Sequence, residues 1–196
     1  MGTRSFLALL LPASAVESAG RLLAGLRERH GDRDVKWVAP ANLHLTLRFF
    51  GDLDAPGLER ARAVVKERAD AWEAIETRWQ ALGAFPSTRR AQVIWLGIDD
   101  ERGALRALAA DVERQLVRAG FGRGDKPFSA HVTLGRVRRG ARFAWPAGSE
   151  GLTSPAAAFS ISRMALMKSL LTPGGPVYTP LETADARHRS PGSDPE

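Results

Sequence analysis

The chain has 196 residues, with 28 lysines and arginines against 22 aspartates and glutamates, four histidines and no cysteine. Its length fits one domain, or two small lobes that share a core. A hydrophobic content of 44% with 26% charged residues is ordinary for a globular protein and excludes disorder of the whole chain. The lack of cysteine excludes disulfides, thiol catalysis and cysteine-ligated metal centres. No apolar run approaches the roughly 20 residues of a membrane-spanning helix, so we expect no membrane partner.

The N-terminus has two interpretations. Residues 1–15 combine an early arginine, an apolar stretch and small residues, as a signal peptide does. The apolar stretch Phe6–Leu11 is short, however, and Pro12 ends it. We therefore predict a buried strand at Arg4–Leu11, followed by a helix at Ser14–Arg29 with Ser14 as its N-cap, and we expect a cytoplasmic protein.

The remaining elements alternate irregularly between strands and helices. Hydrophobic spacing predicts helices at residues 56–71 and 103–119. Strands are predicted at residues 35–38, 43–50, 72–84, 92–98, 128–137, 156–169 and 177–182. From Ala184 onward the composition is typical of a flexible tail, so we expect a single domain over residues 1–183. The lack of strict strand–helix alternation indicates an α+β fold with antiparallel sheets.

A short motif occurs twice, each time within a predicted strand. Residues 42–47 read Asn-Leu-His-Leu-Thr-Leu, and residues 129–134 read Ser-Ala-His-Val-Thr-Leu. Because side chains alternate along a strand, His44 and Thr46 share one face, and so do His131 and Thr133. The repeat suggests two related lobes, each supplying one such strand to a shared cleft.

The residue types in this motif favour acid–base chemistry. Two histidines and two neutral threonines make a poor site for zinc or magnesium, and no Gly-x-Ser-x-Gly sequence supports a serine nucleophile. One neutral imidazole could take a proton from water while a charged one gives a proton to a leaving oxygen. Threonine hydroxyls could hold the non-bridging oxygens of a phosphate. A buried, hydrogen-bonded strand histidine is the alternative for either motif alone.

These residues resemble the two-histidine (2H) phosphoesterase superfamily, in its RNA 2′,3′-cyclic phosphodiesterase branch, historically called 2′-5′ RNA ligase. The resemblance extends over residues 3–183 and includes both motifs, Val93-Ile-Trp-Leu-Gly97 and Leu171-Thr-Pro-Gly-Gly-Pro-Val-Tyr178. It implies a bilobal, pseudo-symmetric fold with two antiparallel sheets lining a central cleft and helices outside. It also implies cofactor-free and metal-free opening of an RNA 2′,3′-cyclic phosphate to a 2′-phosphate.

Carried over to this sequence, the resemblance implies that His44 and His131 are the acid and the base. We assign His131 as the base toward water and His44 as the acid toward the 3′-oxygen, with these roles exchanged in the ligation direction. Thr46 and Thr133 would bind the phosphate.

Four further residues are candidates for contacts with substrate. Arg136 matches a basic position of the family, although strict alternation places it on the face opposite His131. Arg48 shares the predicted face of His44 and could contact backbone phosphates. Phe128 and Trp37 could stack on a terminal base, with core packing as the alternative for each, and Trp95 is expected in the core.

The expected substrate is RNA with a 2′,3′-cyclic phosphate end or a cyclic nucleotide, acted on by a monomer. Two other functions remain open at this stage. One is 2′-5′ RNA ligation by the same groups, and the other is a non-catalytic RNA-binding module. The net charge of +6 fits an RNA partner as well as a merely solvated basic surface.

Overall fold

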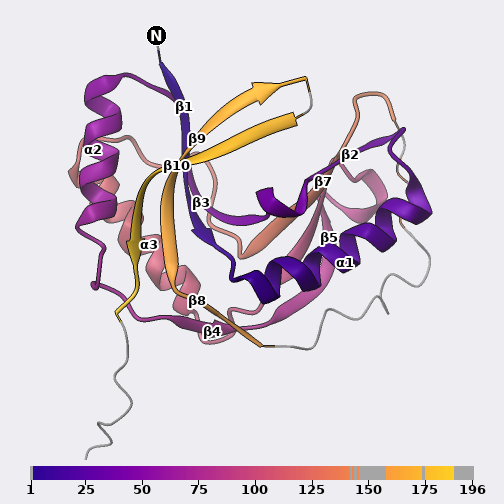
Figure 1. Ribbon diagram of the computed structural model, residues 1–196, viewed down its shortest axis with the longest axis horizontal. Helices are drawn as coiled ribbons and strands as arrows, with labels where there is room; N and C mark the ends of the chain where they lie inside the picture. The colour runs from indigo at the N-terminus through magenta and orange to yellow at the C-terminus, as the bar shows by residue number, and fades with distance from the viewer. Residues whose placement is uncertain (1, 142, 144, 146–157, 174, 188–196) are drawn as a thin grey trace, which may run out of the picture.

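The computed structural model describes residues 2–141, 143, 145, 158–173 and 175–187 (Figure 1). Most strands join one eight-stranded sheet in the order β10-β9-β1-β3-β7-β6-β5, with β2 beside β7, and every pairing within it is antiparallel. Strands β4 and β8 form a separate pair. The elements are β1 (Thr3–Leu10), α1 (Ala13–His30), β2 (Val35–Trp37), η1 (Pro40–Asn42), β3 (His44–Leu53), α2 (Ala55–Lys66), β4 (Ile75–Thr77), β5 (Trp79–Phe85), η2 (Thr88–Arg90), β6 (Val93–Ile98), α3 (Ala104–Arg118), β7 (His131–Val137), β8 (Phe159–Ile161), β9 (Arg163–Thr172) and β10 (Gly175–Asp185).

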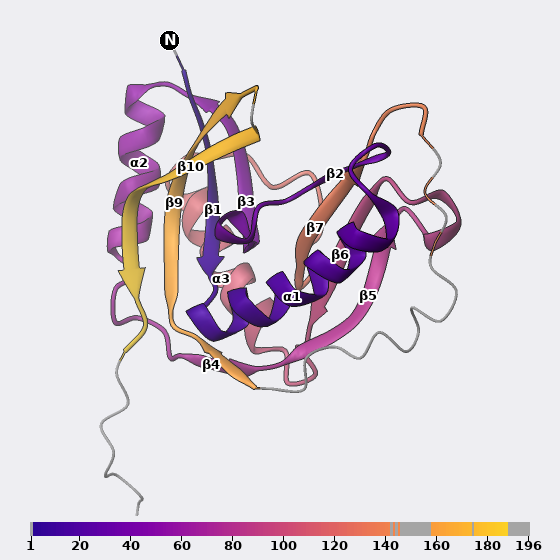
Figure 2. The ribbon, with the colours of Figure 1, turned by 45° about the vertical axis from the view of Figure 1, so that its right-hand side comes forward.

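The large sheet consists of two halves that meet at one residue pair. Strands β10, β9, β1 and β3 make one half, and β7, β6, β5 and β2 make the other (Figure 2). Between β3 and β7, only Leu45 and Val132 are paired. The predicted α+β fold is confirmed, with the two expected sheets joined at this pair.

One face of the sheet is buried under the helices. Leu7, Leu9, Leu45, Val132 and Leu134 are almost fully buried on this face, in one cluster with side chains from all three helices. The other face carries a smaller cluster around Phe6, Ala8 and Met167 and is otherwise more open. Burial of the first face supplies the main stabilisation of the fold.

Two helices cross from one half to the other. Helix α1 follows β1 of the first half, yet its Ser18 accepts a hydrogen bond from Nε1 of Trp79 on β5 in the second half (3.0 Å). Helix α3 follows β6 of the second half, yet its Glu113 pairs with Arg48 on β3 in the first half (2.7 Å). Figure 1 shows the same exchange, with α3 near α2 and α1 on the opposite side.

The N-terminal segment is a strand, as predicted, and it lies between β3 and β9. The predicted cap of α1 was wrong, because Pro12 occupies the N-cap position and no side chain caps that end. By contrast, Asp54 caps α2 by accepting a hydrogen bond from the Gly57 amide (2.8 Å).

Several predicted boundaries were wrong. The helix predicted at residues 56–71 ends at Lys66, and the strand predicted at residues 156–169 is divided into β8 and β9. The strand predicted at residues 72–84 is divided into β4 and β5. Residues 184–187, predicted as tail, belong to the fold, because Ala184 and Ala186 are buried and the Arg187 amide donates to the Trp72 carbonyl. Residues 156–157 of a predicted strand and 188–196 of the predicted tail lie outside the described residues. None of the helices in the described segments is both long and apolar enough to cross a membrane.

Candidate active site

The four motif residues gather where the two halves of the sheet meet. Leu45 and Val132 are opposite one another and point into the core, with no exposed surface. Because side chains alternate along strands, the residues on either side of each point to the opposite face. Antiparallel register places His44 across from Thr133 and Thr46 across from His131. The structure therefore brings together the four residues singled out in the sequence.

Both imidazoles are held in the same way. Nδ1 of His44 lies 2.7 Å from the carbonyl oxygen of Asn42, and Nδ1 of His131 lies 2.9 Å from that of Ser129. A carbonyl oxygen only accepts hydrogen bonds, so each Nδ1 carries a proton and donates it. Each Nε2 is thereby left to exchange a proton with another molecule. The two histidines are equivalent in this respect, as the repeat in the sequence predicts.

Each imidazole also packs against two aromatic rings from its own half of the sheet. His44 lies 4.7 Å from Phe6 and 5.4 Å from Tyr178 between ring centroids. His131 lies 5.1 Å from Phe85 and 6.1 Å from Trp95. These rings fix the orientation of the imidazoles and reduce their contact with water.

The environment lowers the pKa of both histidines. Burial is the main cause for each, and the hydrogen bonds to Asn42 and Ser129 oppose it. The positive charge of Arg136 lowers the pKa of both imidazoles further, and a charge on His131 lowers that of His44. The two imidazoles therefore lie close enough to sense each other, and the free site favours their neutral forms near pH 7.

Arg136 lies on the same face as His131, contrary to strict alternation. On β7, Thr133 pairs with Trp95 and Gly135 pairs with Ile94, so Leu134 is left without a partner as a β-bulge. The extra residue returns Arg136 to the face of His131 and Thr133. Its effect on the pKa of His44 and of His131 agrees with this position.

A matching bulge moves Arg48 away from the site, so its predicted position was wrong. Thr46 pairs with Ala8 and Arg48 pairs with Leu7, which leaves Leu47 unpaired. Arg48 therefore lies on the helix-covered face, where it binds Glu113 and the Gly122 carbonyl oxygen. The side chain that the bulge brings to the His44 face is Phe49, which is 59% exposed and lies 5.6 Å from Phe6.

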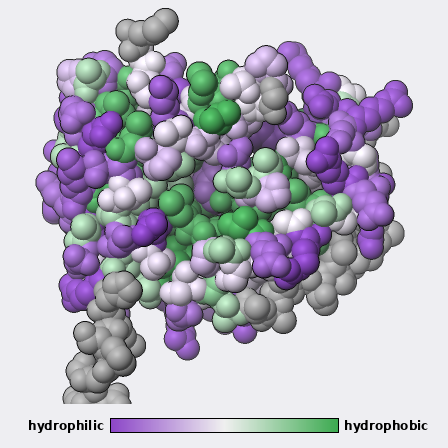
Figure 3. All heavy atoms as spheres, viewed as in Figure 1, coloured by the Kyte–Doolittle hydropathy of each residue, from purple (hydrophilic) through white to green (hydrophobic). Residues whose placement is uncertain are grey.

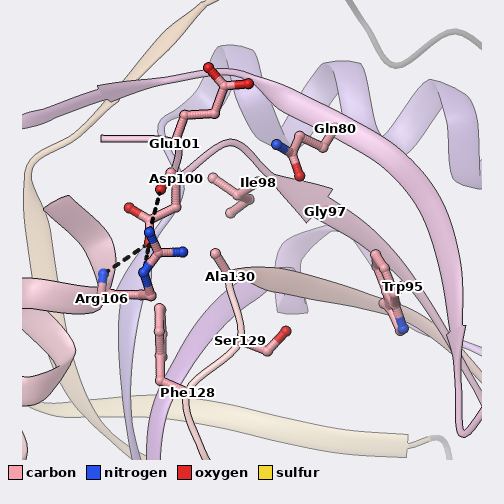
Figure 4. Close-up of a pocket in the computed structure, with 10 residues that line it drawn as sticks. All are labelled: Gln80, Trp95, Gly97, Ile98, Asp100, Glu101, Arg106, Phe128, Ser129 and Ala130. Atoms are coloured by element: carbon pink, nitrogen blue, oxygen red, sulfur yellow. Dashed lines mark hydrogen bonds and ion pairs between the residues drawn. The ribbon is translucent and has the colours of Figure 1, made fainter. Parts of the chain in front are cut away.

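Phe128 lines a pocket of about 390 Å³ beside the strand of His131 (Figure 4). Trp95, Gly97 and Ser129 line it too, and at one end Arg106 forms an ion pair with Asp100. The expectation that Trp95 lies in the core was wrong, because its ring faces His131. Trp37 does not stack on this face, because its Nε1 donates to the Gly31 carbonyl and it packs beside the core.

Two residues of this site were not singled out from the sequence. Tyr178, the only tyrosine of the chain, packs edge-on against His44, and burial raises its pKa. Asn42 donates from its side-chain amide to the Pro176 carbonyl (2.8 Å), two residues before Tyr178. Asn42 thus contacts both His44 and the β9–β10 hairpin. The position of Asn42 two residues before the histidine could have drawn attention to it.

The arrangement suits a small anion rather than a metal ion. Two Nε2 atoms, two threonine side chains and Arg136 share one face. Within the described segments, no group of three or more histidine, aspartate or glutamate side chains is placed to hold a metal ion.

Comparison with known proteins places the chain in a family. The family model described as "2'-5' RNA ligase superfamily" matches residues 13–172. The chain belongs to the 2′-5′ RNA ligase superfamily. One member, the RNA 2′,3′-cyclic phosphodiesterase of Methanothermobacter thermautotrophicus, is 33% identical over 93% of this chain and 98% of its own.

Solved structures agree with this assignment. TT0787 of Thermus thermophilus superposes with a TM-score of 0.73 at 29% identity, over 95% of this chain and all of that one. Escherichia coli LigT complexed with 3′-AMP also gives a TM-score of 0.73, at 24% identity over 96% of this chain and all of its own, and so shares the fold. The resemblance stated from the sequence is thereby confirmed at the level of the superfamily and the fold.

Proposed function

We propose that the protein hydrolyses 2′,3′-cyclic phosphate ends of RNA to 2′-phosphates, with His44 and His131 as its acid and base. The observation that carries this proposal is the matched state of the two imidazoles. Each donates Nδ1–H to a backbone carbonyl and leaves Nε2 free on the face that it shares with the other. The superfamily relative named above, an RNA 2′,3′-cyclic phosphodiesterase, supports the choice of substrate.

The reaction needs a base and an acid on opposite sides of phosphorus. Nε2 of His131 takes a proton from water while the water oxygen bonds to phosphorus. The bond from phosphorus to the 3′-oxygen breaks, and that oxygen takes the proton from Nε2 of His44. One imidazole comes from each half of the sheet, which suits attack and departure in line.

The phosphate oxygens need donors while negative charge grows on them. The hydroxyls of Thr46 and Thr133 and the guanidinium of Arg136 fill this role. The bound phosphate anion also favours the charged imidazole. Substrate binding therefore raises the pKa of the histidine that must donate, in a site that otherwise lowers it.

The experiment replaces each histidine by glutamine and follows ring opening of an RNA end. His44→Gln and His131→Gln should each reduce kcat by at least about 100-fold, the usual contribution of acid–base catalysis. The matched control is His30→Gln, since His30 packs on Phe143 outside this site. Near-normal rates in both site variants would refute the assignment.

The identity of the product tests the direction of attack. Hydrolysis in ¹⁸O-labelled water should place the label in a 2′-phosphate, which ³¹P NMR distinguishes from a 3′-phosphate. RNA with a 5′-hydroxyl, added to the same reaction, reports ligation. Joined product in place of ring opening would favour ligation as the main reaction.

A further inference from the structure

A basic groove lies at the end of β7 that is farther from His131. It has a volume of about 490 Å³, and its lining includes Gln92, Val93, Arg136, Arg138 and Arg139. We call these five residues the arginine groove. No acidic residue is among the described residues that line it. In Figure 3, hydrophilic side chains gather at the upper right, over the ends of β2 and β7.

The described residues supply no counter-charge to the arginines of the groove. Within the described segments, Arg136, Arg138 and Arg139 form no ion pair. Asp34, which adjoins the groove, accepts a hydrogen bond from the Arg138 amide through its backbone carbonyl. Two more exposed cations, Arg89 and Arg90 of η2, precede Gln92 of the groove by three and two residues.

A pair of like charges beside the groove also favours binding of an anion. Lys36 of β2 is the cross-strand partner of Arg136 on β7, and both are exposed. Opposite residues of an antiparallel pair share a face, with Cβ atoms about 5 Å apart, and like charges there destabilise the sheet. An anion between the two side chains turns this repulsion into attraction.

The groove is continuous with the active site through Arg136. This side chain lines the groove, and the bulge at Leu134 places it on the face of His131. A polyanion whose end lies between the histidines would reach the groove next. An RNA strand that ends in a cyclic phosphate carries all of its other phosphates on the 5′ side, whereas a cyclic mononucleotide has none.

We propose that the arginine groove binds the backbone phosphates of the RNA strand 5′ to the cyclic end, so that the enzyme prefers oligonucleotides to cyclic mononucleotides. This inference rests on the proposed function. The arginine groove contacts the RNA strand and not the reacting phosphate. Arg138 and Arg139 therefore have no role in turnover of a mononucleotide.

The test compares two substrates in the variant R138A/R139A. One is adenosine 2′,3′-cyclic phosphate, and the other is a short oligoribonucleotide that ends in the same group. For the oligonucleotide, KM should rise about tenfold at low salt, from the loss of charge-assisted contacts to phosphate. For the mononucleotide, kcat and KM should stay at wild-type values, which also shows that the variant is folded.

Salt dependence measures how many phosphates the groove contacts. Each contact with a single strand contributes about 0.7 to the slope of log affinity against log salt. Losing two contacts should reduce the slope by about 1.4. Between about 50 and 200 mM salt, oligonucleotide kcat/KM of the wild type should therefore fall roughly sevenfold more than that of the variant.

The matched control removes the same charge elsewhere. Arg114 and Arg118 are exposed on α3, which packs on the opposite face of the sheet, and R114A/R118A should leave both substrates unaffected. An unchanged oligonucleotide KM in R138A/R139A would overturn the inference, and so would equal losses with both substrates.

A binding measurement separates this inference from the proposed function. Fluorescence anisotropy of a labelled oligoribonucleotide with a 3′-phosphate requires no turnover. Its affinity should fall about tenfold in R138A/R139A at low salt, even if the wild type proved inactive. Equal affinities for wild type and variant would refute binding of RNA by the arginine groove.

Discussion

Gly83 is the position where one added methyl group should affect both stability and catalysis. A Cβ there would lie far inside van der Waals contact with Cη2 and Cζ2 of the Trp95 indole. The indole would have to move, and with it the aromatic wall that Trp95 and Phe85 form beside His131. Overpacking of this kind costs about 1–3 kcal/mol. For a chain of this size, Tm should fall by roughly 2–12 °C in Gly83→Ala.

The effect on catalysis follows from the position of His131. A shift of about 1 Å in a catalytic group can reduce the rate about 100-fold. We expect kcat/KM of Gly83→Ala for a cyclic nucleotide to fall between about tenfold and 100-fold. Trp95→Phe removes the two indole atoms nearest to the new methyl group, so it should restore part of the stability in the double variant.

Gly25 provides the matched control for the same chemical change. It lies within α1, and a Cβ there would meet nothing within 4 Å. Alanine is favoured over glycine inside a helix by about 0.5–1 kcal/mol, so Gly25→Ala should raise Tm by roughly 1–4 °C. Thermal unfolding followed by circular dichroism measures both variants. A wild-type Tm and wild-type kcat/KM in Gly83→Ala would refute the reasoning.

Four further predictions concern the site and its surroundings. Because burial lowers the pKa of His44 and His131, kcat/KM measured across pH should peak below about 6.5, where one imidazole is charged and the other neutral. Asn42→Ala removes a hydrogen bond to the β9–β10 hairpin, worth about 1 kcal/mol, and should reduce kcat/KM severalfold, whereas Ser129→Ala retains its carbonyl and should not. Arg48→Ala should lower the free energy of unfolding in urea by about 1–3 kcal/mol, because Glu113 loses its ion-pair partner and keeps only the Gly124 amide, with KM for a cyclic mononucleotide unchanged. Prolonged dialysis against EDTA should leave the rate unchanged, because the proposed chemistry uses only side chains of the protein.

Each of these expectations has a clear contrary result. A kcat/KM optimum above about pH 7 would mean that the free enzyme does not hold its histidines at a lowered pKa. Equal losses of kcat/KM in the Asn42 and Ser129 variants would show that the hydrogen bond to the hairpin does not matter for catalysis. A raised KM in Arg48→Ala would indicate that Arg48 contacts the substrate. Activity that is lost in EDTA and restored by one metal ion would indicate a metal-dependent active site.

The central pair of strands was predictable because local pattern and global fold agree there. Alternation of apolar and polar residues places Leu45 and Val132 in the core and the histidines outside, and it needs no knowledge of the partner strand. The repeat of the motif and the family resemblance then predicted that the two strands meet at a shared cleft.

The arginines were harder to place because one unpaired residue reverses alternation. The bulge at Leu134 is followed by Gly135, and a glycine inside a strand often marks such a site. The bulge at Leu47 has no glycine after it, and strict alternation therefore placed Arg48 on the wrong face. The contact of Asn42 with Pro176 and that of His44 with Tyr178 each join residues more than 130 positions apart, a distance over which pattern carries no information.

The crossing of α1 and α3 between the halves makes the two repeats dependent on each other. If the chain were cut between the two motifs, the C-terminal fragment would lose β2 and α1, whose Ser18 contacts Trp79 on β5. The N-terminal fragment would lose β9, β10 and the partner of Arg48. Neither fragment could bury its apolar face alone. Unfolding should therefore occur as one cooperative transition, and a fragment with one motif should gain structure only when its complement is added.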